Sequence, residues 1–501
     1  VLLVRNKKEF SALGSKCPHY GAPLSKGVLR GQRLRCPWHG ACFNIKTGDI
    51  EEYPSLDCLP CFKVTVEHGK VFVRAKKKVL TLPAVISTSS TLGQDTSKRC
   101  LLNRDTVLLL GGGVAAMVCA ETLRQEGFTG RIIMATKEKH VPYDKVKLSK
   151  EMNLKAEDVY LRTPEFLDAH GIELWTEKEA VSVDFQKQKV CFTDGSSEKY
   201  DQLLIATGSH SRFLEVPGAD LQNVCILQTP EDSSKILELA TGRNLVIIGA
   251  SFIGTRLEGQ ASRHPAPARD TNETGVQPGA AMPPPAPARA QLPLPLQMLQ
   301  NKGVKFYMKT ELRELKGKDG KVTEAVLASG EKLPADVVVV GIGVFPNSAF
   351  LKGSSIARDD SGAILVDLRM QTNVPHVFAA GDVVSFPVAL LNGARSSIRH
   401  QQVAEAHGHV AALNMLKKEK ELHTVPFFWT TMLGKSIRYA GCGKGYTDTV
   451  VKGSLEQQKF LIFYIRNGIV TAAASLDCDP MVSLIAEVLY LGKQISKEEA
   501  E

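Results

Sequence analysis

Hydrophobic and polar positions alternate in three different ways along the chain. Over residues 1–74, short alternating runs such as 62–66 and 71–73 lie between glycine, proline and asparagine turns, which predicts a small all-β domain. From Asp105 onward, apolar runs lead into glycine turns and helical periods, a pattern typical of βαβ units. Near the end, apolar runs at 459–465 and 471–475 precede an amphipathic stretch at 482–491 and predict a compact α+β domain.

Three apolar runs indicate two nucleotide-binding units in the middle of the chain. The runs at 106–110 and 244–248 each lead into a glycine turn, and the run at 336–340 precedes Gly341. We therefore expect a multidomain α/β protein: an N-terminal all-β domain, two Rossmann-like domains and a C-terminal α+β domain. The expected boundaries are 1–75 for the all-β domain, 76–103 for a linker, 104–225 and 361–425 for the two parts of the first nucleotide-binding domain, 226–360 for the second, and 426–501 for the end domain.

One segment departs from this regularity. Residues 264–296 hold nine of the 25 prolines of the chain in 33 positions, and proline removes a backbone donor and breaks helices. We expect neither a helix nor a central strand there, so the second nucleotide-binding domain should be disrupted. A misassigned exon or a retained intron is our hypothesis for its origin.

Composition excludes some classes of protein. The formal net charge of +9 is scattered along the chain and indicates no specific nucleic-acid site, and no run approaches the roughly eighteen apolar residues of a membrane-spanning helix. Eleven cysteines are few for a disulfide scaffold of 501 residues and favour a reducing compartment with metal ligation. Because the sequence begins at Val1 inside an expected strand, we expect a targeting segment and the first strands of the domain to be missing from it.

Two boxes near the start of the chain combine cysteine with histidine. Cys17-Pro-His19 and Cys36-Pro-Trp-His39 are separated by sixteen residues. A 2Fe-2S centre with two thiolates on one iron and two imidazoles on the other needs two loops of this kind. Zinc also binds two cysteines and two histidines, but zinc fingers usually place like residues together. We predict a 2Fe-2S cluster with these four side chains as ligands.

These boxes resemble those of Rieske ferredoxins and of ring-hydroxylating oxygenases. Where respiratory Rieske proteins carry an additional cysteine in each box, this chain has Ala22 and Trp38, so the resemblance implies the ferredoxin type, with a lower potential. Cys58 and Cys61 have the spacing of a redox pair, but they lack its βα context. We expect them in a loop before a strand.

A glycine-rich turn follows the apolar run at 106–110. Gly111, Gly113 and Ala116 stand between that strand and a helical stretch, which is the context of a dinucleotide fingerprint. Glycines let the backbone approach a pyrophosphate, whose charge the helix N-terminus favours. Glu138, about twenty residues further on, is placed to accept ribose hydroxyls.

Three later motifs identify the nucleotide by resemblance. Ala206-Thr207-Gly208 and Gly381-Asp382 resemble the additional FAD motifs of flavoproteins with two dinucleotide domains, and 142–150 resembles a signature of ferredoxin reductases and apoptosis-inducing factors. With the Cys/His boxes, the chain is similar to apoptosis-inducing factors that join a Rieske domain to an FAD-dependent oxidoreductase. The resemblance implies that Asp382 holds the ribityl chain, that Lys150 is the catalytic residue beside the flavin, that Lys145 replaces an arginine, and that Trp429 approaches the flavin.

The corresponding NAD(P)H fingerprint is altered. Gly249 and Gly254 frame it and Gly341 follows the third strand, but Ser251 replaces the middle glycine and crowds the pyrophosphate. Arg256 stands where the family has a glutamate that pairs with the lysine near the flavin. We expect weak or absent NADH binding.

Two functions remain open. The first is an FAD-dependent oxidoreductase that passes electrons from NAD(P)H through FAD and the Rieske cluster to an unknown acceptor. The alternative is a pro-apoptotic signalling protein in which the redox fold acts as a binding module. The resemblance implies a mitochondrial location, otherwise a cytoplasmic one, and nothing in the sequence determines the oligomeric state.

Two other redox classes are disfavoured. Disulfide reductases need a cysteine pair after the first nucleotide unit, and no cysteine lies between Cys119 and Cys191. An oxygenase needs an iron triad. His400, His407 and His409 lack that spacing and are expected on a helix surface or beside the flavin.

Overall fold

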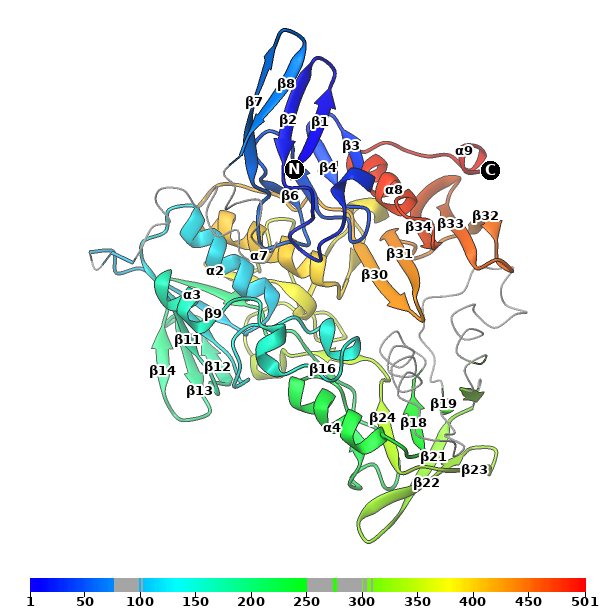
Figure 1. Ribbon diagram of the computed structural model, residues 1–501. Coiled ribbons are helices and arrows are strands. Elements are labelled where there is room, and N and C mark those ends of the chain that lie inside the picture. Colours follow the sequence, from blue (N-terminus) through cyan, green and yellow to red (C-terminus); the bar gives the residue numbers. More distant parts are fainter. Residues whose placement is uncertain (76–98, 101, 250–273, 277–299, 301–303, 308–309) are drawn as a thin grey trace.

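The computed structural model describes residues 1–75, 99–100, 102–249, 274–276, 300, 304–307 and 310–501. These residues form an all-β unit, two units built on parallel sheets, and a C-terminal α+β unit (Figure 1). The multidomain α/β fold expected from the sequence is confirmed. Most of the expected linker and most of the proline-rich segment lie outside the described residues.

The N-terminal unit consists of two antiparallel four-stranded sheets. Leu13 and Phe43 are buried in its core, because strands turn alternate side chains inward, and Leu24 and Leu59 from the connecting segments fill the same core. The strands are β1 (Leu2–Asn6), β2 (Glu9–Leu13), β7 (Cys61–Glu67) and β8 (Lys70–Arg74) in one sheet, and β3 (Val28–Arg30), β4 (Arg33–Arg35), β5 (Cys42–Asn44) and β6 (Ile50–Glu52) in the other.

The first parallel unit is built around a five-stranded sheet whose strands are apolar throughout, because both faces are covered. Its last strand follows the second parallel unit in sequence, so this unit is made from two separate parts of the chain. In sheet order the strands are β11 (Ile172–Trp175), β10 (Arg131–Ala135), β9 (Thr106–Leu110), β15 (Gln202–Ile205) and β27 (Val377–Ala379).

Helices and small sheets complete this unit. Helices α2 (Val114–Gln125) and α7 (Gln401–Met415) pack so closely that a Cβ on Gly408 would lie 2.2 Å from the carbonyl oxygen of Ala115. The remaining elements are α3 (Pro164–Ala169), β12 (Ala180–Asp184), β13 (Lys189–Phe192), β14 (Ser197–Lys199), β26 (Ile364–Leu365), β28 (Val384–Pro387) and β29 (Arg395–Ser396).

The second parallel unit corrects one prediction. Strand β19 (Thr274–Val276) lies within the proline-rich segment and pairs in parallel on both sides, so a central strand does form there. Proline is absent between Pro267 and Pro278, and the prediction failed because it averaged composition over the whole segment. In order the strands are β17 (Val224–Cys225), β24 (Val337–Val340), β18 (Leu245–Ile248), β19 and β20 (Lys305–Tyr307).

Other elements flank this sheet and connect it to the first unit. Helix α4 (Pro230–Ala240) begins with a Thr229 cap, whose side chain accepts a hydrogen bond from the backbone N–H of Asp232. The strands are β21 (Leu312–Lys318), β22 (Lys321–Leu327) and β23 (Lys332–Pro334), together with β16 (Ser209–Ser211) and β25 (Val344–Pro346), which pair with each other.

The C-terminal unit has the predicted α+β fold. Helix α8 (Met481–Tyr490) covers one face of an antiparallel sheet and buries Val482, Ile485 and Leu489 against it, as expected for an amphipathic helix. The strands, in sheet order, are β30 (Phe427–Met432), β31 (Lys435–Gly441), β34 (Ile469–Leu476), β33 (Lys459–Arg466) and β32 (Asp448–Ser454), and α9 (Lys497–Ala500) ends the chain.

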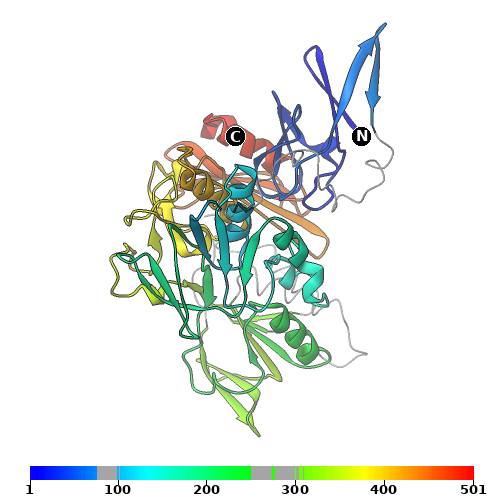
Figure 2. The ribbon, with the colours of Figure 1, turned by 90° about the vertical axis from the view of Figure 1, so that its left-hand side faces the viewer.

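The units are arranged in a definite order in space. In both views the N-terminal unit (blue) lies at one end beside the C-terminal unit (red and orange), and the second parallel unit (green) lies at the opposite end (Figures 1 and 2). The first parallel unit lies between them. No helix in the described part of the chain is long and apolar enough to cross a membrane.

Candidate redox site

The two Cys/His boxes form two similar loops of the N-terminal unit. The backbone N–H of Cys17 donates to the carbonyl of Ala22 at 2.8 Å, and that of Cys36 donates to the carbonyl of Ala41 at 2.7 Å. Gly21 and Gly40 turn these loops with φ of +75° and +78°, a region that favours glycine. Each loop therefore presents one cysteine and one histidine from a tight turn.

The four side chains of these boxes come together as two like pairs. The thiols of Cys17 and Cys36 are hydrogen-bonded to each other, and the Nδ1 atoms of His19 and His39 lie 3.0 Å apart. In the described residues, no group of three or more His, Cys, Asp or Glu side chains is spaced to hold a single metal ion. The pairing of like donors fits a centre with two thiolates on one iron and two imidazoles on the other.

Burial sets the protonation of these side chains. It lowers the pKa of His19 to about 3, with the charges of Lys150 and Lys147 adding to the effect, and lowers that of His39 well below its ordinary value. Both rings are therefore neutral at pH 7, as imidazole ligands must be. The hydrogen bond from Cys17 lowers the pKa of the Cys36 thiol, which favours a thiolate.

The histidine side of the boxes faces the residues expected beside the flavin. Trp429 stacks on His39 with ring centroids 4.7 Å apart and meets His19 edge-on at 5.4 Å. The ammonium of Lys150 lies 5.9 Å from the ring centroid of Trp429 and equally far from that of Tyr20. The structure thus brings together Trp429, Lys150 and the predicted iron ligands.

A hydrogen bond connects the first box to the loop at 142–150. The Tyr20 hydroxyl donates to Oδ2 of Asp144 at 2.6 Å, and the Tyr20 ring lies edge-on to both His19 and His39. Burial, followed by the Asp144 charge, raises the pKa of Tyr20, so the phenol remains a donor. The sequence alone assigned neither residue a function, because they lie 124 positions apart.

The glycine fingerprint lies at the carboxyl ends of the parallel strands. A Cβ on Gly111 would lie 2.1 Å from the carbonyl oxygen of Ala206, so the loop and the second predicted FAD motif are in direct contact. At Gly113, just before α2, a Cβ would meet no atom within 4 Å. This open approach to a helix N-terminus suits a pyrophosphate, and Ala116 is buried in the first turns of the same helix.

The other expected FAD residues lie at the same edge of the sheet. Thr207 donates to the carbonyl of Asn347 at 2.7 Å, and Gly208 follows with φ of +69°. Asp382 accepts a hydrogen bond from Ser209 at 3.1 Å, and burial raises the pKa of its carboxyl. A Cβ on Gly381 would lie 3.4 Å from that of Ala115, so Gly381 borders the fingerprint helix.

Two expected cofactor residues contact each other. The Nζ of Lys145 lies 2.6 Å from Oε1 of Glu138, so the lysine neutralises the acid predicted to accept ribose hydroxyls.

His407, expected on a helix surface or beside the flavin, is completely buried, and its Nδ1 accepts from the backbone N–H of Gly381. A helix-surface position is therefore wrong for His407, because α7 is enclosed by its neighbours.

The second nucleotide fingerprint is described only in part. Gly249 has φ of +104°, and a Cβ there would lie 2.4 Å from the carbonyl oxygen of Gly341, so the two expected glycines are in contact. Gly254, Ser251 and Arg256 lie outside the described residues. Cys58 lies in the loop before β7, as predicted, whereas Cys61 is the first residue of that strand.

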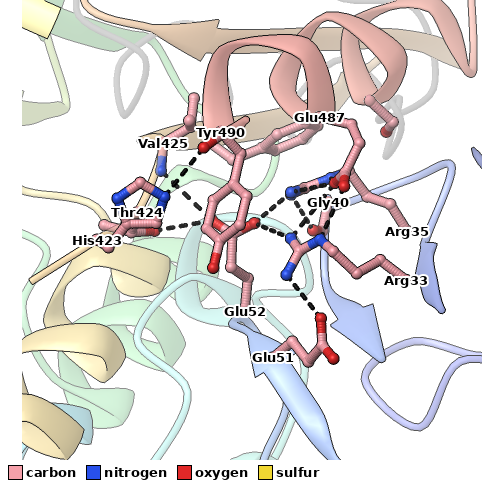
Figure 3. A network of polar contacts seen from close by, with 12 residues as sticks. Arg33, Arg35, Gly40, Glu51, Glu52, His423, Thr424, Val425, Glu487 and Tyr490 are labelled. Atoms are coloured by element: carbon pink, nitrogen blue, oxygen red, sulfur yellow. Dashed lines mark hydrogen bonds and ion pairs between the residues drawn. The ribbon is translucent and has the colours of Figure 1, made fainter. Parts of the chain in front are cut away.

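A buried ion network holds the N-terminal unit on the C-terminal unit. Figure 3 shows Arg33 and Arg35 from β4 reaching Glu487 of α8 and Glu52 of β6. The Nε atoms of Arg33 and Arg35 lie 2.7 and 2.9 Å from the Glu487 carboxylate, and both guanidinium groups also contact Glu52. The side chains of Arg35, Glu52 and Glu487 are at most 3% exposed, so the pairs are shielded from water.

Helix α8 also holds the second Cys/His box directly. Ser483, one turn before Glu487, donates to the carbonyl of Cys36 at 3.0 Å, while Arg35 donates to the carbonyl of Gly40 at 2.9 Å. Both ends of the box are therefore fixed. Sequence reasoning missed these contacts, because nothing local in the sequence shows which helix packs against the box.

Comparisons with known families agree with this geometry. Residues 105–408 match the pyridine nucleotide-disulphide oxidoreductase family, residues 1–63 the Rieske 2Fe-2S domain, and residues 427–501 the reductase C-terminal domain. The Rieske match decides against zinc at the Cys/His boxes. It implies a 2Fe-2S cluster, and the oxidoreductase family implies FAD and NAD(P)H.

Individual relatives extend the similarity to the whole chain. Apoptosis-inducing factor 3 of Homo sapiens is 46% identical over all of this chain and 82% of the human protein. The ferredoxin–NAD(+) reductase component of the biphenyl dioxygenase system of Paraburkholderia xenovorans is 28% identical over 79% of this chain and 96% of that protein.

Two solved structures share the fold. A ferredoxin reductase for the CYP199A2 system of Rhodopseudomonas palustris has a TM-score of 0.72 at 27% identity, covering 79% of this chain and 97% of its own. Putidaredoxin reductase in a covalent complex with putidaredoxin has a TM-score of 0.74 at 25% identity, covering 79% and 96%.

Fold and site together define a ferredoxin-reductase-like, FAD-dependent oxidoreductase that carries a Rieske domain. The chain belongs to the pyridine nucleotide-disulphide oxidoreductase family and, within it, to the apoptosis-inducing factor 3 group.

Proposed function

We propose that the protein passes electrons from NAD(P)H through FAD to its own Rieske cluster, and from there to an acceptor. Cys17, Cys36, His19 and His39 are the proposed ligands. The observation that carries the proposal is the stacking of Trp429 on His39 at 4.7 Å, with Lys150 beside the same tryptophan. The proposed cluster is thereby part of the same chain, whereas putidaredoxin reductase forms a complex with putidaredoxin, a separate protein.

We assign a role to each residue of the site from the geometry of the described residues. Gly111, Gly113 and Ala206 admit a dinucleotide, Glu138 and Asp382 accept from its hydroxyls, and FAD, when bound, supplies the change from two-electron to one-electron chemistry. Lys150 places a positive charge beside Trp429 and the histidines. Trp429 excludes water between the boxes and the loop at 142–150, since the residue is only 4% exposed.

Reduction of the cluster by NADH tests this proposal. In the holoprotein, NADH should bleach the flavin and then produce the EPR signal of a reduced Rieske centre. Trp429→Ala should slow the second step at least tenfold and leave the first unchanged. Trp175→Phe, a tryptophan of β11, serves as the control. Flavin bleaching without any cluster signal would end the proposal.

A pro-apoptotic role is a second candidate, which the name of the human and mouse relatives favours. In this case the redox fold acts as a binding module. Overexpression of a Cys17→Ser variant, which cannot hold the cluster, separates the two functions. Death induction that survives this change would show that electron transfer through the cluster is not its cause.

We also propose the mitochondrial location that the family resemblance implies. Fractionation of cells that express the protein from its complete native gene tests it. Recovery of the protein in the cytosol alone would contradict this location.

A further inference from the structure

A buried cation of the C-terminal unit faces the second Cys/His box. Arg438 of β31 is 4% exposed and pairs directly with Trp429 of β30 across the antiparallel strands. Such cross-strand partners lie on the same face of a sheet. Trp429 uses that face to stack on His39, so Arg438 is directed toward the same box.

The charge of Arg438 is only partly compensated. Its guanidinium donates to the carbonyls of Thr430 and Ile437 at 3.1 and 3.0 Å, and Nη2 contacts Oδ2 of Asp479 at 3.3 Å. Its Nε is buried without a hydrogen-bond partner in the described part of the protein. Asp479 keeps a quarter of its side chain exposed, so water weakens this counter-charge.

The positive charge acts on the proposed ligands. Cys36 and His39 are both among the groups that interact electrostatically with the Arg438 guanidinium, so the cation lies close to the box. A cation near the box favours any further negative charge at this position. Asp477 and Asp479 also face Arg438 and act in the opposite sense.

The box cannot move away from this cation. Ser483 of α8 holds the carbonyl of Cys36, and Arg35 holds that of Gly40 within the ion network of Figure 3. Both α8 and β31 belong to the C-terminal unit and pack against each other through its core. The separation between Arg438 and the box is therefore fixed by packing within that unit.

We propose that Arg438 acts as a positioning residue. Its positive charge, held in place beside the second box, raises the reduction potential of the Rieske cluster. Reduction adds one negative charge to a centre with two thiolates and two neutral imidazoles, and a cation in a water-poor surrounding stabilises the reduced state. The oxidoreductase part of the chain thus sets the potential of the cluster that it is proposed to reduce. The inference rests on the cluster being present and is independent of the direction of electron flow.

A redox titration of the full-length, cluster-loaded protein tests this inference without turnover. Midpoint potentials are read from the EPR signal of the reduced centre with chemical mediators. Arg438→Gln should lower the ratio of reduced to oxidised cluster about tenfold at fixed ambient potential, which is about 59 mV for one electron. Arg438→Lys should retain most of the parent potential. Asp479→Asn should raise the potential, because it removes the opposing charge.

Arg313→Gln is the matched control, because it removes the same charge from an exposed position on β21, at the opposite end of the molecule. Iron content and visible circular dichroism establish that each variant is loaded. An unchanged potential in Arg438→Gln overturns the inference, as does an equal fall in Arg438→Lys, which would indicate geometry and not charge. If Arg438→Gln fails to hold the cluster, the sign of the Asp479→Asn shift decides, and a fall or no change contradicts the proposal.

Discussion

At the contact between the N-terminal and C-terminal units, a single position requires glycine for two reasons. Gly40 follows the ligand candidate His39 and has φ of +78°. Its missing side chain makes room for Phe427 of the C-terminal unit, since a Cβ there would lie 2.6 Å from that ring. The requirement for glycine comes partly from the turn and partly from a residue nearly four hundred positions away.

Replacement of Gly40 by alanine should therefore destabilise the protein more than left-handed strain alone. We expect a loss of about 2–5 kcal/mol, from roughly 1–2 kcal/mol of backbone strain and about 1–3 kcal/mol of overpacking. Gly31→Ala is the control, because Gly31 has φ of +59° and a Cβ there meets nothing within 4 Å. Equal losses in chemical denaturation of the two variants would show that Phe427 moves aside freely.

The buried carboxyl of Glu405 on α7 should make the stability of the protein depend on pH. Burial raises the pKa of its carboxyl from 4.5 to about 8, and its Oε2 has no hydrogen-bond partner in the described residues. Because the folded pKa is raised, the stabilising contribution of Glu405 is complete below pH 4.5 and is lost as the pH rises through 8. The free energy of unfolding should fall between these values by up to about 1.4 kcal/mol per pH unit.

Glu405→Gln should flatten that fall and make the protein more stable at pH 8, because the amide can still accept from Gln401. Thermal midpoints at pH 5 and pH 8 measure the effect, with the exposed Glu456→Gln as control. A slope unchanged by Glu405→Gln would assign the pH dependence to other groups.

At the scale of elements, one helix of the C-terminal unit completes a site of the N-terminal unit. Ser483 and Glu487 lie one turn apart on α8 and hold the Cys36 box and the β4 arginines. Burial alone would raise the pKa of Glu487, but Arg33 and Arg35 outweigh it and lower the pKa. The helix therefore presents a charged carboxylate to two buried cations.

Truncation of this carboxylate should be costly. Glu487→Ala leaves Arg33 and Arg35 with only part of their counter-charge, and breaking a buried pair in this way costs about 3–5 kcal/mol. We expect that loss in denaturant unfolding, together with faster amide exchange in β4. Glu498→Ala, on the exposed surface of α9, is the control. A loss below about 1 kcal/mol would mean that the two units are held together by other contacts.

At the scale of the whole molecule, the order of the units suits the proposed electron path. The second parallel unit lies at one end, the Rieske domain and the C-terminal unit lie side by side at the other, and the first parallel unit lies between them. Strand β19 completes the five-stranded sheet of the second parallel unit despite the prolines around it. If NADH binds weakly, we therefore expect the cause to lie in the altered fingerprint and not in the sheet.

Ser251→Gly should accordingly tighten NADH binding. The change restores a glycine where a β-carbon and a hydroxyl crowd the pyrophosphate, and we expect at least a threefold lower Kd by fluorescence titration. Ser329→Gly, in the turn after β22, is the control. Micromolar affinity of the unaltered chain, unimproved by the change, would contradict the expectation of weak binding.

The sequence by itself determined the chemistry of this protein, because chemistry depends on short motifs. The mixed Cys/His boxes, the glycine turn after 106–110, and the motifs at 206–208 and 381–382 are each local, so the cluster, FAD and the fold class could be predicted. Composition failed at β19, because three residues free of proline suffice for a strand when neighbouring strands offer hydrogen bonds on both sides.

Only the tertiary structure decided how these local motifs meet. Trp429 against His39, Tyr20 on Asp144, Arg438 behind Cys36, and α8 on β4 all join residues that are more than a hundred positions apart. Such contacts depend on which surfaces the folded units present to each other, and no hydrophobic period or motif spacing records that choice. The cluster site is thus predicted from the sequence, while its charged surroundings are a property of the packed units.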